Sequence, residues 1–139
     1  MARPLEPQQI ERLLEAARSA RARAHAPYSN FHVGAAVLDD QGRIHAGCNV
    51  ENAAYPLGTC AEANAIASFV IAGGGRVAAI LVLGEGERLV APCGGCRQRM
   101  REFADPDTPI LVADPRRVRE EFTLEQLLPH SFGPENLKT

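Results

Sequence analysis

The sequence lacks the features that would direct it to a membrane or to nucleic acid. Its longest mostly apolar stretch, residues 63–72, contains Asn64 and Ser68 and is far too short to span a bilayer. The amino terminus has no apolar segment typical of a secretory signal, so we expect a cytoplasmic protein. There is no tract of lysine and arginine, aromatic residues make up 5% of the chain, and the formal net charge is -2. We therefore expect neither a nucleic-acid partner nor a membrane partner.

The composition is that of an ordinary soluble domain. The chain has 139 residues, of which 45% are hydrophobic and 23% are charged, close to the averages for globular proteins. It shows no internal repeat, low-complexity segment or linker. We expect a single domain over residues 1–139.

The spacing of apolar residues predicts a mixed α/β chain. Helices are expected over residues 8–25, 60–72, 94–103 and 123–128. Strands are expected over residues 31–38, 43–49, 77–83 and 109–113, with a short extended piece through Leu89 and Val90. The first two strands form an antiparallel hairpin. This order predicts a three-layer α/β/α fold with a mixed sheet of about five strands.

The cysteines carry the most specific chemistry. Without a secretory signal, four cysteines favour metal binding or catalysis over a disulfide framework. Cys93 and Cys96 form a C-x-x-C motif at the expected start of a helix, where helix amides and the macrodipole stabilise thiolates. Cys60 stands at the start of another predicted helix. If the two helices run side by side from neighbouring strands, three thiolates can share one ion.

Three ligands and a nearby carboxylate indicate an open metal site. A structural zinc site is normally closed by four protein ligands, whereas a catalytic site keeps one position free for water. Glu62 lies two residues after Cys60 and can fold back toward that position to accept and return a proton. Cys48 lies within a predicted strand, and we interpret it as a core residue. As a fourth ligand it would instead close the site and make a non-catalytic, zinc-stabilised binding module.

Five motifs along the chain carry a narrower signal. They are Phe31-x-Val33-Gly34-Ala35-Ala36, Asn49-Val50-Glu51-Asn52-Ala53, Thr59-Cys60-Ala61-Glu62, Pro92-Cys93-Gly94-Gly95-Cys96-Arg97-Gln98, and the closing Leu127-Leu128-Pro129-His130-Ser131-Phe132-Gly133-Pro134. Together, and in this order, they resemble the small homotetrameric zinc-dependent cytidine deaminases.

The resemblance implies a reaction. Members of the family hydrolyse cytidine and 2′-deoxycytidine to uridine and 2′-deoxyuridine with release of ammonia, a step of pyrimidine salvage. Cys60, Cys93 and Cys96 match the ligands of Zn²⁺, and Glu62 matches the proton shuttle. A zinc-bound hydroxide would attack C4 of the base while Glu62 carries protons to N3 and to the departing amine. Both nucleosides keep the 3′-hydroxyl, so the sequence does not rank them.

The resemblance also implies contacts to the nucleoside. The backbone N–H of Ala61 and the carbonyl of Ala91 match the family's contacts to the base. Asn49 and Glu51 match the pair that hydrogen-bonds the ribose 3′-hydroxyl. One amide and one carboxylate can together satisfy a hydroxyl's donor and its acceptors.

Aromatic residues extend these contacts across subunits. Phe31 matches a ring that lies against the base, and Phe132 matches a second ring that comes from another subunit. Tyr55 matches a residue that reaches a neighbouring subunit's nucleoside. The resemblance therefore implies a homotetramer with shared active sites.

One position departs from the family pattern. Three-cysteine members usually carry arginine directly after the catalytic glutamate, where it bonds a zinc thiolate, but this chain has Ala63. Three thiolates around Zn²⁺ leave surplus negative charge, which works against deprotonation of the bound water. We predict that Arg97 and the two helix N-termini offset this charge, with Asn64 as a weaker candidate.

A neighbouring deaminase function stays open at this point. The chain could act on another nucleoside, a free base, a nucleotide, a nucleoside antibiotic or nucleic acid. Asn49 and Glu51 disfavour a nucleotide, because a carboxylate near the sugar sits poorly beside a phosphate.

Overall fold

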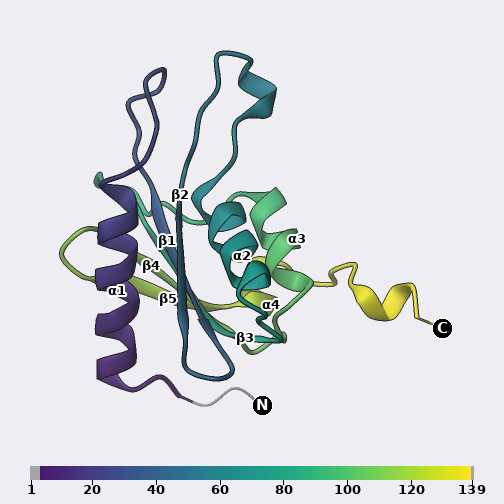
Figure 1. The fold of residues 1–139 in the computed structure, drawn as a ribbon. Helices are drawn as coiled ribbons and strands as arrows, with labels where there is room; N and C mark the ends of the chain where they lie inside the picture. Colours follow the sequence, from purple (N-terminus) through teal and green to yellow (C-terminus); the bar gives the residue numbers. More distant parts are fainter. Residues whose placement is uncertain (1–3, 139) are drawn as a thin grey trace.

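In the computed structural model, which describes residues 4–138, five strands form one mixed sheet with helices on both faces (Figure 1). The helices are α1 (Pro7–Arg21), α2 (Ala61–Ile71), α3 (Gly94–Arg101) and α4 (Leu124–Leu127), with short 3-10 turns η1 (Tyr55–Leu57) and η2 (Pro134–Asn136). The strands are β1 (Gly34–Asp39), β2 (Ile44–Cys48), β3 (Val77–Leu83), β4 (Pro109–Ala113) and β5 (Val118–Thr123). The predicted three-layer α/β/α class is confirmed.

The strand order in the sheet is β2-β1-β3-β4-β5. β1 pairs antiparallel with both β2 and β3, β3 pairs parallel with β4, and β4 pairs antiparallel with β5. The central strand β3 is almost entirely buried, as its nearly continuous apolar sequence predicts for a strand covered on both faces.

Two apolar clusters fill the space on either side of the sheet. On one side, alternate residues of β1 and β3 such as Val37 and Ile80 pack with Phe69 of α2 and Met100 of α3. On the other side, the residues of β1 and β3 whose side chains point to the opposite face, such as Leu81, pack against α1. Figure 1 accordingly shows α1 alone on one face, and α2, α3 and α4 on the other. Each large side chain buried in this way contributes about 1.5–3 kcal/mol.

A close approach of α2 to β2 sets the position of α2 on the sheet. A Cβ atom on Gly47 of β2 would lie only 2.3 Å from the backbone nitrogen of Ala65 in α2. Non-bonded atoms do not come this close to a Cβ atom, so only glycine allows the helix to lie this near to the strand. The amino-terminal end of α2, where Cys60 lies, is thereby fixed relative to the sheet.

Helix α1 ends earlier than predicted. It stops at Arg21, whereas the apolar spacing predicts a helix to residue 25. The backbone N–H of His25 donates to the carbonyl of Asn49 at 3.0 Å, and the carbonyl of His25 accepts from the backbone N–H of Glu51 at 2.8 Å. These long-range bonds replace the next helical turn and attach the segment after α1 to residues 49–51.

The fifth strand is β5 and not the extended piece predicted through Leu89 and Val90, which forms no strand. β5 is an edge strand with partly exposed residues. Three of its six residues are charged (Arg119, Glu120 and Glu121), and charged residues are less common in buried strands.

Within residues 4–138, the helices are too short or too polar to span a membrane.

Candidate active site

Three cysteine sulfurs meet where α2 and α3 begin. Cys60 caps the amino terminus of α2, Cys93 caps that of α3, and Cys96 follows in the first turn of α3. Their Sγ atoms all lie within 4.8 Å of one another, and the Sγ atoms of Cys60 and Cys93 are 4.0 Å apart. Tetrahedral Zn–S bonds of about 2.3 Å place sulfurs roughly 3.8 Å apart, so the three thiols fit one zinc ion. Cys48 lies outside this group.

The three thiols differ in how readily they ionise. Burial raises the pKa of Cys60 and the pKa of Cys96. The backbone N–H of Cys96 instead lowers the pKa of Cys93. Two of the three thiols therefore resist ionisation by themselves, whereas a divalent ion between them stabilises all three as thiolates.

Glu62 lies in the first turn of α2 and is only 5% exposed. Burial raises the pKa of its carboxyl, and its own backbone N–H and the charge of Arg99 act in the opposite direction. A carboxyl with a raised pKa exchanges protons more readily near neutrality than an ordinary one. Its burial therefore suits Glu62 to accept and return a proton next to the thiols.

An open cleft of about 360 Å³ leads to these residues, a volume in the range of small-molecule sites. It is lined by most of the residues that the sequence predicts for the site: Phe31, Asn49, Glu51, Tyr55, Cys60, Ala61, Glu62, Ala91 and Cys93. The fold thus brings the predicted base-binding and ribose-binding residues to the same cavity as the thiols and the carboxyl.

Asn49 holds the segment that carries Phe31. Its side-chain Oδ1 accepts from the backbone N–H of Val33 at 2.9 Å, and its Nδ2 donates to the carbonyl of Phe31 at 2.8 Å. A primary amide has a second N–H and a second acceptor lone pair. Asn49 therefore keeps one donor and one acceptor site for a ligand while it fixes the loop.

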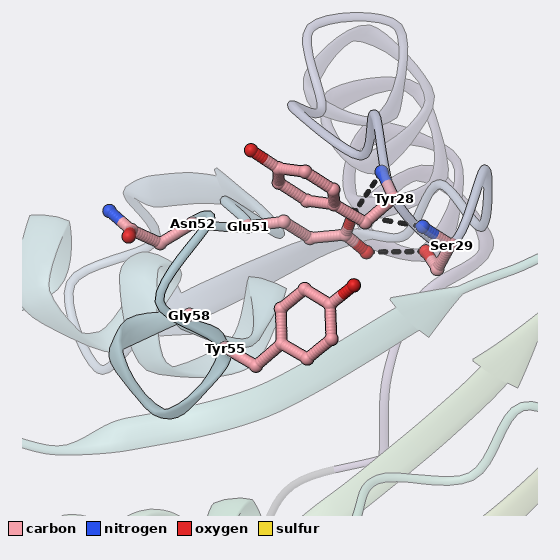
Figure 2. A pocket seen from close by; sticks show the side chains of 6 residues that line it. All are labelled: Tyr28, Ser29, Glu51, Asn52, Tyr55 and Gly58. Atoms are coloured by element: carbon pink, nitrogen blue, oxygen red, sulfur yellow. Dashed lines mark hydrogen bonds between the residues drawn. The ribbon is translucent and has the colours of Figure 1, made fainter.

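Glu51 is held by the loop before Phe31 (Figure 2). Its Oε1 accepts from the backbone N–H groups of Tyr28 at 3.0 Å and Ser29 at 3.1 Å, and its Oε2 accepts from the Ser29 hydroxyl. The hydrogen bond from the Ser29 hydroxyl is the main reason why the pKa of Glu51 is lowered, and the two backbone N–H groups lower this pKa further. Glu51 is thus an ionised carboxylate in a fixed orientation at the cleft.

Figure 2 shows the residues that line a second hollow, of about 310 Å³. This hollow shares Glu51, Tyr55 and Gly58 with the cleft. The rings of Tyr28 and Tyr55 flank it, with centroids 5.7 Å apart and planes inclined by 60°. Tyr55 therefore lines its own chain's site and is also 73% exposed. Phe132 is 57% exposed and does not line the cleft. The contributions of both residues to a neighbouring subunit stay predictions.

The arginines near the thiols differ in what they contact. The Nε of Arg97 donates to the carbonyl of Pro92 at 2.7 Å, and its Nη1 donates to the carbonyl of Leu127 at 2.9 Å. The role predicted for Arg97 in offsetting charge stays a prediction. Sequence reasoning missed Arg99, whose Nη1 lies 3.6 Å from Sγ of Cys96. Arg99 follows Cys96 by three residues, a spacing that makes two side chains neighbours on a helix, and this spacing could have predicted the contact.

Three thiols at the ends of two helices, a buried glutamate two residues after the first thiol, and the mixed sheet beneath them define a zinc-dependent deaminase. The family model for the cytidine and deoxycytidylate deaminase zinc-binding region matches residues 7–112. The chain belongs to this family, and its similarity to cytidine deaminases over most of its length identifies it as a zinc-dependent enzyme of that type.

Individual relatives agree in sequence and in fold. A cytidine deaminase from Sporosarcina psychrophila is 40% identical over 128 residues, which cover 92% of this chain and 94% of the relative. A crystal structure of cytidine deaminase from Burkholderia pseudomallei superposes with a TM-score of 0.81 at 46% identity and covers 88% of this chain and 98% of that one. The cytidine deaminase structure from Mycobacterium tuberculosis has a TM-score of 0.75 at 41% identity, covering 88% of this chain and 96% of its own.

Proposed function

We propose that the enzyme hydrolyses cytidine and 2′-deoxycytidine to uridine and 2′-deoxyuridine, with water consumed and ammonia released. The observation that carries the proposal is the buried carboxyl of Glu62, which opens onto the same cleft as Cys60 and Cys93. Relatives named as cytidine deaminases, about 40% identical over nearly the whole chain, support a cytosine nucleoside as substrate.

Cys60, Cys93 and Cys96 would hold the zinc ion, which when bound supplies an activated water for attack at C4 of the base. Glu62 is the proton carrier of this proposal. It would accept one proton from the attacking water and deliver it to N3. It would then accept the second proton, from the hydroxyl on C4, and deliver it to the exocyclic amine as the C4–N bond breaks. The raised pKa of Glu62 supports this role, because the same group must both take and release protons.

The remaining residues of the cleft would hold the nucleoside. The backbone N–H of Ala61 and the carbonyl of Ala91 would bind the base edge, with the ring of Phe31 against its face. Asn49 and Glu51 would bind the ribose 3′-hydroxyl. Their existing hydrogen bonds support this assignment, because those bonds orient both side chains before any substrate arrives.

We further propose a homotetramer with shared active sites. The exposure of Phe132, Tyr55, Leu57 and Ile71, the last at 87%, supports burial of these side chains by other subunits. In this assembly Phe132 and Tyr55 would contact the nucleoside of a neighbouring subunit. In the same site, Arg97 would add positive charge beside the thiolates.

Four reduced cysteines suit the cytoplasm, where the reaction would serve pyrimidine salvage.

The test is ammonia release from a matched panel of cytidine, 2′-deoxycytidine, cytosine, dCMP, adenosine and guanine. We expect turnover of the first two alone, with the ultraviolet change that accompanies conversion of cytosine to uracil. A 3′-deoxycytidine arm tests the ribose contacts, and its KM should rise about tenfold if a charge-assisted hydrogen bond is lost. Turnover of cytosine or dCMP in preference to cytidine would reject the proposed substrate class.

A further inference from the structure

The three arginines of α3 have different partners. Arg97 donates to the carbonyls of Pro92 and Leu127. Arg101 donates to the Ser131 hydroxyl and to the carboxylate of Glu135. Arg99 is the one of the three whose guanidinium reaches a metal-binding sulfur, with Nη1 lying 3.6 Å from Sγ of Cys96, within the range of an N–H···S hydrogen bond.

The side chain of Arg99 runs back over the first turn of its own helix. A Cβ atom on Gly95 would lie 3.2 Å from Nη1 of Arg99, which places the guanidinium beside residue 95. This is the amino-terminal, positive end of α3, where the helix dipole disfavours a cation. A guanidinium is stable there when an anion lies next to it, and the sulfur of Cys96 would be that anion once it is a zinc-bound thiolate.

Helix α2 offers no cation for the same purpose. Glu62 is the single charged residue of Ala61–Ile71, and the next residue is Ala63. The side-chain amide of Asn64 donates to the carbonyl of Cys48 at 2.7 Å and to the Thr59 hydroxyl at 3.0 Å, so both of its N–H groups have partners other than sulfur. Positive charge in direct contact with the thiolates therefore comes from α3.

We propose that Arg99 is the positioning residue that stabilises Cys96 as a zinc-bound thiolate, at a site where Ala63 leaves no arginine next to Glu62. The inference rests on the proposed function, in which Cys96 is a zinc ligand. An N–H donor to a thiolate withdraws charge from the sulfur and fixes its direction toward the metal. Removal of such supporting groups typically weakens metal binding by about 10- to 100-fold, and exposure of Arg99 places it at the lower end.

The test compares Arg99→Gln, Arg99→Lys and the matched control Arg12→Gln, which removes an exposed arginine of α1 on the other face of the sheet. Zinc transfer to a chromogenic chelator should be about tenfold faster in Arg99→Gln, intermediate in Arg99→Lys, and unchanged in Arg12→Gln. In the cobalt-substituted proteins, the sulfur-to-cobalt charge-transfer absorption should move to lower energy in Arg99→Gln, because the sulfur loses a hydrogen bond.

A wild-type release rate together with an unshifted cobalt band in Arg99→Gln would overturn the inference. So would faster release in Arg97→Gln alone, which would assign the cation to Arg97. If Arg99→Gln does not fold, Arg99→Lys carries both measurements. Zinc content and deaminase activity of the wild type are measured first. Their absence rejects the proposed function, whereas an Arg99→Gln protein that matches a zinc-loaded, active wild type rejects this inference alone.

Discussion

The guanidinium of Arg101 binds the carboxylate of Glu135 through two N–H donors, at 2.7 Å and 3.3 Å, and so attaches the carboxy-terminal arm to α3. The same guanidinium donates to the Ser131 hydroxyl at 2.8 Å, and Gln98 donates to the carbonyl of Phe132 at 2.8 Å. A Cβ atom on Gly133 would lie 2.4 Å from Cζ of Arg101, so the guanidinium lies directly against the backbone at Gly133. The arm, seen as the yellow segment in Figure 1, therefore presents Phe132 in a defined place.

Arg101→Gln should raise the KM for cytidine by about two- to fivefold, because the arm would present Phe132 less precisely to a neighbouring subunit of the proposed homotetramer. The turnover number should change little. Glu15→Gln, which removes the Glu15–Arg18 pair of α1, is the matched control. Steady-state kinetics measure the KM and the turnover number, and light scattering measures the molar mass of the oligomer. An unchanged KM and mass would contradict this account of the arm.

Glu62→Gln should lower the turnover number at least about 100-fold, the lower range of what a positioned acid–base group contributes. The amide fills the same space but carries no proton that it can exchange. Zinc content should be retained, because the three thiols are unchanged. Burial opposes ionisation of Glu62, so the neutral side chain should not reduce the free energy of unfolding. A variant with zinc bound and near-normal turnover would remove Glu62 from the mechanism.

Asp39→Asn should destabilise the fold by about 2 kcal/mol at pH 7. Burial by itself would raise the pKa of Asp39, but hydrogen bonds from His45, from the N–H groups of Arg43 and Gln41, and from the Arg43 guanidinium lower it from 3.8 to about 2. A carboxyl whose pKa is depressed by folding stabilises the protein above its unfolded pKa and loses this effect as pH falls through its folded pKa. The stabilisation is therefore complete above about pH 5 and lost between about pH 4 and pH 2.

Urea unfolding of wild type and Asp39→Asn at pH 7, 4 and 2.5 measures this effect. The difference in unfolding free energy between the two proteins should shrink steadily as the pH falls. A difference that is the same at all three values would show that the contribution of Asp39 does not depend on its charge.

Gly47→Ala should destabilise the fold by about 2 kcal/mol or more, because the added methyl group meets the backbone of α2 at Ala65 and Ala61. The helix must move away from β2, and Cys60 moves with it, so zinc retention should also fall. Gly75→Ala is the matched control, since its Cβ would meet nothing nearer than Asp40 at 3.8 Å. Chemical denaturation and zinc analysis of both variants measure the outcome, and equal stability of the two would refute it.

The sequence predicted those parts of the fold and site that local pattern determines. The continuous apolar runs predicted β3 and β4 with their observed bounds. The C-x-x-C motif of Cys93 and Cys96, with Cys60 at the start of a second predicted helix, predicted a thiol cluster, since the end of a helix fixes where its first residues point. Each of these signals is read from a short stretch of sequence.

Features that depend on distant partners were not predictable in the same way. The segment after α1 is held by two backbone hydrogen bonds, in which the N–H of His25 donates to the carbonyl of Asn49 and the N–H of Glu51 donates to the carbonyl of His25, and no local signal marks them. β5 was missed because an edge strand needs little apolar character. Arg99 was missed because Arg97 lies next to Cys96 in the sequence, although the spacing of three residues between Cys96 and Arg99 favours a contact on the helix; in the structure Arg97 binds carbonyls and Arg101 binds the carboxy-terminal arm.

Cys60 and Cys93 are separated by 33 residues, and the whole of α2 and the central strand β3 lies between them. Zinc held by both sulfurs, as proposed above, would close this segment into a ring. Closing a loop of this length in the unfolded chain costs conformational entropy worth roughly 4 kcal/mol, which a chain that kept the zinc link would have lost before it folds. The proposed zinc ligands would therefore act as a reversible cross-link and couple the folding of the central strand to the supply of zinc.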